Sequence, residues 1–249
     1  MISEHSSQAE RAAGETFATT HWTVVLAAGH GSALQADRAL EELCRQYWYP
    51  LYAFVRRQGH SKEDAEDLTQ GFFARLLERN YFESLRSEKG RFRAFLLASL
   101  KHFIANEGDR ARRQKRGAGA ALLSLDLQDA DMRYQIEPAH QLSPDKLYDR
   151  AWVLTLLEQV ITRLRNELVS EGKADLFENL KPFLMAGKSA VPGAEVAAKA
   201  GLTDGALRVA VHRLRKRYRE LLREEIAQTL ADPTQAEEEI KALFSAFES

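Results

Sequence analysis

Between Arg208 and Arg223 the sequence places seven Lys or Arg residues and a single acidic residue. Guanidinium and ammonium groups at this density favour binding to phosphate groups, which nucleic acids carry in regular rows. At helical spacing, the basic side chains that gather on one face are those of Arg208, His212, Arg215, Lys216 and Arg219. The segment therefore predicts a helix with a cationic face that binds nucleic acid. A solvated basic helix in a bundle is the alternative interpretation.

The elements that must position this face are an apolar surface and a turn. Apolar residues recur at spacings of four, three, four and three, which groups Leu207, Val211, Leu214, Tyr218 and Leu221 on one face. A short helix is expected to end at Lys199, with a tight turn at Gly201, because glycine tolerates a positive φ. Thr203 is then placed to cap the second helix, small Ala197 lets the two helices approach, and Leu202 is expected to be a buried plug. This pattern predicts a helix-turn-helix, whose second helix enters the major groove N-terminus first. The residues nearest the bases would be Asp204, Gly205 and Arg208.

A second cluster of charged residues opens another predicted helix. Ser61 and Asp64 have the spacing of a capping box, and four acids lie between residues 63 and 67, where the helix dipole favours them. The apolar face of this helix contains Ala65, Leu68, Phe72, Phe73, Leu76 and Leu77. Two explanations of these acids are equally good. They interact with the helix dipole and with water, or they bind a partner protein.

Aromatic and basic residues adjoin in a third segment. Residues 92–106 have the pattern of an apolar helix, which runs into residues 110–116, where five of seven are basic. Rings beside a basic run are typical of single-stranded DNA binding, because bases stack while phosphates pair with cations. A core helix with a solvated basic end is the alternative.

Other chemistry has no residues to carry it. The seven histidines show no ligand spacing, and the single cysteine, Cys44, excludes a zinc cluster and an intramolecular disulfide. We expect Cys44 to be a core residue of a predicted helix. The sequence has no phosphate-binding loop, dinucleotide glycine pattern or nucleophile elbow, so neither an enzyme nor a cofactor or metal is expected. Without a membrane-spanning run or a signal peptide, the protein is predicted to be cytoplasmic.

Helical periodicity recurs along the chain without any strand pattern, so the predicted fold is all-α. We expect two helical domains joined by a flexible linker, and Pro50 is expected to kink or break the first helix. The predicted parts are an N-terminal extension (1–36), a first domain (37–117), a linker (118–143), a second domain (144–228) and a tail (229–249).

The tail is predicted to be an acidic amphipathic helix that starts near Pro233 and carries Glu237, Glu238 and Glu239. Two interpretations are open. The helix masks the basic residues 213–219 in the unbound protein, or it packs on its own domain with its acids in water.

The stretch DAEDLTQGFFARL at Asp64 to Leu76, together with the helix-turn-helix, resembles a bacterial RNA polymerase sigma factor of the sigma-70 family. It is similar to the extracytoplasmic-function (ECF) class, which keeps only sigma domains 2 and 4. The resemblance implies that residues 37–117 bind core polymerase and the minus-10 promoter element, and that residues 144–228 bind the minus-35 element. The implied partners are core RNA polymerase and promoter DNA, and an anti-sigma factor or another protein regulator is a candidate partner.

The resemblance also assigns individual residues. Core-polymerase binding falls on Asp64, Asp67 and Gln70. Minus-10 binding falls on Lys101, Asn106, Arg110 and Arg113, and minus-35 binding on Gly205, Arg208, His212, Arg213 and Lys216. The chain departs from the family pattern at Gly71, where an acid is common, and at Phe95, where tryptophan is common. The alternative functions are an independent helix-turn-helix regulator of duplex operators and a helical adaptor that binds only protein. The acidic helix favours the sigma factor, since a plain regulator has no need of it.

Overall fold

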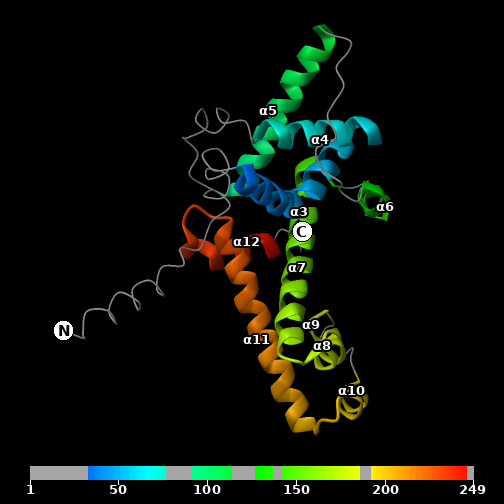
Figure 1. Ribbon diagram of the computed structural model, residues 1–249, viewed down its shortest axis with the longest axis vertical. Helices are drawn as coiled ribbons and strands as arrows, with labels where there is room; N and C mark the ends of the chain where they lie inside the picture. The colour runs from blue at the N-terminus through cyan, green and yellow to red at the C-terminus, as the bar shows by residue number, and fades with distance from the viewer. Residues whose placement is uncertain (1–32, 77–90, 114–126, 137–141, 186–191, 246–249) are drawn as a thin grey trace, which may run out of the picture. The chain divides into compact units, whose positions relative to one another are not determined.

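The computed structural model describes residues 33–76, 91–113, 127–136, 142–185 and 192–245 (Figure 1). Over these ranges the regular elements are helices, accompanied by one isolated β-bridge between Arg91 and Leu230. The predicted all-α fold is therefore confirmed. None of the helices in these ranges is long and apolar enough to cross a membrane.

The chain forms two compact units. The first comprises Met1–Tyr148 and Ala227–Gln235, and the second comprises Asp149–Ile226 and Ala236–Ser249. The boundaries between them fall inside helix α7 and near the end of helix α11.

The first unit contains α3 (Ala33–Arg57), α4 (Lys62–Leu76), α5 (Phe92–Arg113) and α6 (Leu127–Ile136). The sequence predicted a kink or a break at Pro50. Helix α3 continues through Pro50, so a break there is wrong, whereas a kink stays a prediction. Cys44 is buried, as expected of a core residue, and burial raises the pKa of its thiol to about 12. At neutral pH that thiol is protonated and a poor nucleophile.

Aromatic rings hold these helices together. Phe72 of α4 makes edge contacts with Phe73 and with Phe103 of α5, at centroid distances of 5.9 Å each. Tyr47 of α3 meets Phe92 of α5 at 5.5 Å. All five rings are buried, so the apolar faces predicted for these segments form one core.

The junction between α3 and α4 follows its sequence signals. Gly59 takes a φ of +97°, which a glycine adopts without a Cβ clash. The backbone N–H of Asp64 donates to Ser61 Oγ at 3.0 Å, which caps α4. The predicted cap at Ser61 is confirmed.

Helix α6 lies where a flexible linker was predicted. Its Tyr134 ring meets Tyr52 at 6.4 Å, and the Arg133 guanidinium lies 4.2 Å from the centroid of the Tyr49 ring. Ala130 is buried. The sequence did not predict this helix because cation–π and ring contacts with α3 hold it, and such contacts leave no apolar periodicity.

The second unit contains most of α7 (Pro144–Ser170), followed by α8 (Ala174–Leu180), α9 (Pro182–Met185), α10 (Gly193–Lys199), α11 (Asp204–Gln228) and α12 (Ala236–Ser245). Figure 1 shows α11 as the long orange helix beside the yellow-green α7. A short 3₁₀ turn, η3 (Pro233–Gln235), precedes α12. The tail helix therefore begins near the predicted proline, with Ala236 and Leu243 buried.

Candidate nucleic-acid interface

The turn between α10 and α11 is built by backbone hydrogen bonds. Gly201 takes a φ of +63°, its N–H donates to the carbonyl of Ala198 at 3.2 Å, and Leu202 N–H donates to the carbonyl of Ala197 at 2.9 Å. This pair of bonds is a Schellman motif, which ends α10 and reverses the chain. Leu202 remains partly exposed, so it is not the fully buried plug that the sequence predicted.

Helix α11 then begins at a side-chain cap. The N–H of Ala206 donates to Thr203 Oγ at 3.2 Å, as predicted. Ala197 is 4% exposed, and a Cβ built on Gly193 would lie 3.8 Å from Leu207 Cδ2. The small residues of α10 therefore let the two helices approach, and the helix-turn-helix is formed.

The inner face of α11 matches its sequence pattern. Leu207, Leu214 and Leu221 are buried, whereas Val211 and Tyr218 are partly exposed. Burial raises the pKa of Tyr218. The apolar spacing therefore predicted the buried side of α11.

A cationic hollow of about 550 Å³ opens beside the start of α11. Phe183, Leu207 and Val211 supply its apolar lining, and its basic lining is Arg208, His212, Arg215 and Arg219. Arg215 donates to the carbonyl of Phe183 through Nε at 3.2 Å and Nη2 at 2.8 Å, so its guanidinium is anchored. Arg208, His212 and Arg219 are exposed. Anchored and exposed cations around one hollow can bind an anion such as a phosphate.

The predicted minus-35 residues do not share one surface. Arg208 and His212 line the cationic hollow, and Gly205 is exposed with no atom near a built Cβ. Lys216 is exposed and lies 3.8 Å from Glu220. Arg213 instead lines a second hollow of about 400 Å³, whose apolar lining includes Leu164, Leu168 and Leu176. Consecutive helical residues are about 100° apart around the helix axis, so Arg213 lies on a different side of α11 from Arg208.

The predicted polymerase-binding residues lie on α4. Asp64 and Asp67 are exposed and Gln70 is partly exposed. Thr69 is buried and donates to the carbonyl of Ala65 at 2.7 Å, which is a polar contribution that the apolar pattern missed. The acids therefore form an exposed edge above a packed inner face.

Gly71, the departure from the sigma pattern on this helix, lies against α5. A Cβ built there would lie 3.3 Å from Phe103 Cζ, so a larger side chain would require that ring to shift. Phe95, the other departure, is 5% exposed and belongs to the core.

The predicted minus-10 residues lie along α5. Lys101 and Asn106 are exposed, whereas the side chains of Arg110 and Arg113 lie outside the described residues. The Lys101 ammonium forms an ion pair with Asp145 and lies 5.4 Å from the centroid of the Phe54 ring. Lys101 therefore already has an anionic partner in this chain.

The partner of Lys101 belongs to a segment that sequence reasoning assigned to the second domain. Within the first unit, Arg57 Nε donates to the carbonyl of Leu142 at 2.9 Å. Tyr148 Oη donates to the carbonyl of Arg93 at 2.9 Å. These contacts fix residues 142–148 on the first unit. Two of the acceptors are backbone carbonyls, which carry no sequence signal.

Comparison with known proteins found one similarity, which lies within the first unit. Residues 43–117 match the model of the family described as sigma-70 region 2. The match extends over α4, α5 and most of α3. No curated protein and no solved structure gave a significant match. The match covers less than a third of the chain and shows that this part is similar to sigma-70 region 2.

Proposed function

We propose that this protein is an alternative sigma factor of the ECF class, which binds core RNA polymerase and directs it to promoters. The observation that carries the proposal is the sigma-70 region 2 match over residues 43–117, in a chain that also forms a helix-turn-helix with a cationic hollow. In this proposal the protein catalyses nothing by itself and supplies promoter specificity to the polymerase.

The exposed acidic edge of α4 is the proposed polymerase contact. Asp64, Asp67 and Gln70 bind the polymerase, and the inner face of the same helix holds the first unit together. A basic surface on the polymerase would attract these exposed carboxylates. An acidic edge carried by a rigid, capped helix presents these groups at fixed spacing.

Promoter melting is assigned to α5 of the first unit. Lys101, Asn106, Arg110 and Arg113 bind the minus-10 element, whose unpaired bases are captured as the duplex opens. Capture of unstacked bases offsets part of the cost of unpairing them, which is a few kcal/mol.

Minus-35 recognition is assigned to the start of α11. The N-terminal end of the helix enters the major groove, where Gly205 allows close approach and Arg208 reaches base edges. His212 and Lys216 follow on the same side. Arg213 was expected in this set, but its place at the second hollow counts against a base or phosphate contact.

Run-off transcription tests the proposal. Purified full-length protein and core RNA polymerase are incubated with a library of genomic fragments, and the transcripts are sequenced. We expect discrete start sites that depend on the protein. Transcripts that start at the same sites without the protein would refute the sigma-factor function.

The double variant Asp67→Lys with Gln70→Ala serves as the matched control. It should lose core-polymerase binding in a pull-down while circular dichroism reports unchanged helix content. A variant that still binds polymerase as well as the unmodified protein would remove the α4 assignment. Protein that binds selected duplexes but never directs transcription would instead be an independent regulator.

A further inference from the structure

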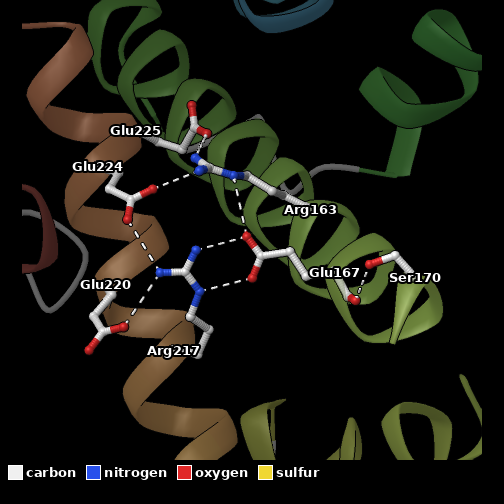
Figure 2. Close-up of polar contacts among 7 residues, drawn as sticks. All are labelled: Arg163, Glu167, Ser170, Arg217, Glu220, Glu224 and Glu225. Atoms are coloured by element: carbon white, nitrogen blue, oxygen red, sulfur yellow. Dashed lines mark hydrogen bonds and ion pairs between the residues drawn. The ribbon is translucent and has the colours of Figure 1, made fainter. Parts of the chain in front are cut away.

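Six charged side chains interlock between α7 and α11 in the second unit (Figure 2). Helix α7 contributes Arg163 and Glu167, and helix α11 contributes Arg217, Glu220, Glu224 and Glu225. We call these six residues the α7–α11 cluster. Most of its members are partly exposed, so water screens each pair and the geometry matters more than the number of pairs.

Arg217 is the most fully engaged member. Its Nε and Nη2 each donate to a carboxylate oxygen of Glu167 at 2.8 Å, which is a bidentate pair. Its Nη1 lies 3.3 Å from Glu224 and 3.5 Å from Glu220. The hydrogen bonds that Arg217 donates to Glu167 raise the pKa of Arg217 and lower the pKa of Glu167. A planar guanidinium group that makes two parallel hydrogen bonds fixes the orientation of the two side chains as well as the distance between them.

Arg163 crosses in the opposite direction. Its Nη2 donates to Glu224 at 2.7 Å and its Nη1 to Glu225 at 2.9 Å, and its Nε lies 3.8 Å from Glu167. Burial by itself would lower the pKa of Arg163, but Glu225 and Glu224 outweigh it and the pKa is raised. Each helix therefore sends an arginine to acids of the other, which resists both rotation and sliding.

The cluster lies on the side of α11 that faces away from the cationic hollow. Arg217 is nine residues beyond Arg208, and at about 100° per residue this places the two on opposite sides of the helix. Arg217 lines the second hollow with Leu164 and Leu168 of α7, whereas Arg208 lines the first. A helix that presents Arg208 to DNA therefore directs Arg217 at α7.

We infer that Arg217 and Glu167 are positioning residues for DNA recognition. Their bidentate pair sets the rotation and height of α11 on α7, and thereby directs Arg208 and His212. Arg217 does not contact DNA, although the sequence counts it among the basic residues of this helix. The inference rests on the proposed function, since it concerns the same DNA-reading helix.

Glu167→Gln gives the decisive test. A phosphate contact by Arg217 and a positioning role for the pair predict changes of opposite sign in the affinity for duplex DNA. If Arg217 were a phosphate contact, removal of its competing carboxylate would strengthen duplex binding. If the pair positions α11, affinity falls, by roughly fivefold, as expected for a partly exposed network. The probe is a duplex selected from a random pool by the full-length protein, and binding is read by fluorescence anisotropy. Increased or unchanged affinity would overturn the inference.

Arg217→Lys adds a second arm. Lysine keeps the positive charge but cannot make the bidentate bond, so a positioning role predicts the same loss, with an unchanged salt dependence. The matched control is Glu178→Gln, which removes the pair of Arg165 and Glu178 at 3.0 Å between α7 and α8. That pair does not touch α11, so the control should bind DNA as the unmodified protein does.

A distance measurement separates this inference from the proposed function. Spin labels at Asn166→Cys on α7 and Val209→Cys on α11 occupy exposed positions, and buried Cys44 does not compete for the label. We expect one narrow distance distribution that Glu167→Gln broadens at unchanged helix content. An unaltered distribution would refute positioning even if DNA binding fails altogether, and that failure would count against the proposed function alone.

Discussion

Arg208 and Arg217 lie on one helix, yet their surroundings differ in kind. Arg208 is exposed at the rim of a cationic hollow, beside the exposed His212. Arg217 is held by three carboxylates, of which Glu167 binds it bidentately at 2.8 Å. A count of basic residues therefore overstates a DNA-binding surface. The cations left without carboxylate partners in the fold are the ones able to exchange water and counterions for phosphates.

We expect the largest change in DNA affinity from substitution of the exposed Arg208. Arg208→Ala should lower the affinity for a selected duplex by about 1–3 kcal/mol, because a specific base contact is lost. The loss should be concentrated at one or two base positions of the duplex. Anisotropy titrations with single-base variants of the duplex measure it. An even loss across all the variants would contradict the proposed orientation of α11.

For the Arg217–Glu167 pair we expect a smaller effect, on the pH dependence of the free energy of unfolding. Arg217 lowers the pKa of Glu167 below its ordinary value of 4.5, so the carboxylate stabilises the folded state above that pH. This contribution is lost as the pH falls through the lowered pKa of the folded state. Urea unfolding at pH 7 and pH 3.5 should show a smaller pH-dependent loss for Glu167→Gln than for the unmodified protein. The difference should stay below about 1 kcal/mol, since the pair is partly exposed. Identical pH dependence would show that the pair contributes no stability.

Lys101 is intermediate between the two arginines, because it is exposed but paired with Asp145. Asp145→Asn should release the ammonium and raise the affinity for single-stranded DNA about twofold, in keeping with an exposed pair. Titration of a labelled oligonucleotide at low salt measures the gain. Lys146→Gln, a neighbouring change that leaves the pair intact, is the control. Equal affinity of Asp145→Asn and the unmodified protein would show that the pair does not compete with DNA.

The smallest effect is expected in the tail helix. Glu237 lies 3.5 Å from Arg223, and both side chains are mostly exposed. With Ala236 and Leu243 buried, this arrangement favours packing of α12 on its own unit over masking of residues 213–219. Glu237→Gln with Glu238→Gln should therefore change duplex affinity by less than about twofold, even at low salt. A gain of tenfold at low salt would revive the masking hypothesis.

Local sequence signals were enough to predict several helix starts, turns and buried faces. The turn before α11 was predicted from Gly201 and its cap from Thr203. Its buried face was predicted from the spacing of Leu207, Leu214 and Leu221. These signals act within one or two helical turns. Ser61 did the same for the cap of α4. The all-α fold and the sigma-factor resemblance followed from such local signals.

The availability of the charged groups depends on how the helices pack, which local signals do not predict. Helix α6 could not be predicted, since its Tyr134 and Arg133 pack on rings of α3 about eighty residues earlier. Asp145 was expected in the second domain, but it pairs with Lys101 of the first unit. Helical spacing already places Arg217 on another side of the helix from Arg208, but only the structure shows that Glu167 of α7 holds it. A charged side chain pairs with the group that lies within about 3 Å of it across a helix interface. The spacing of residues in the sequence does not show which group that is.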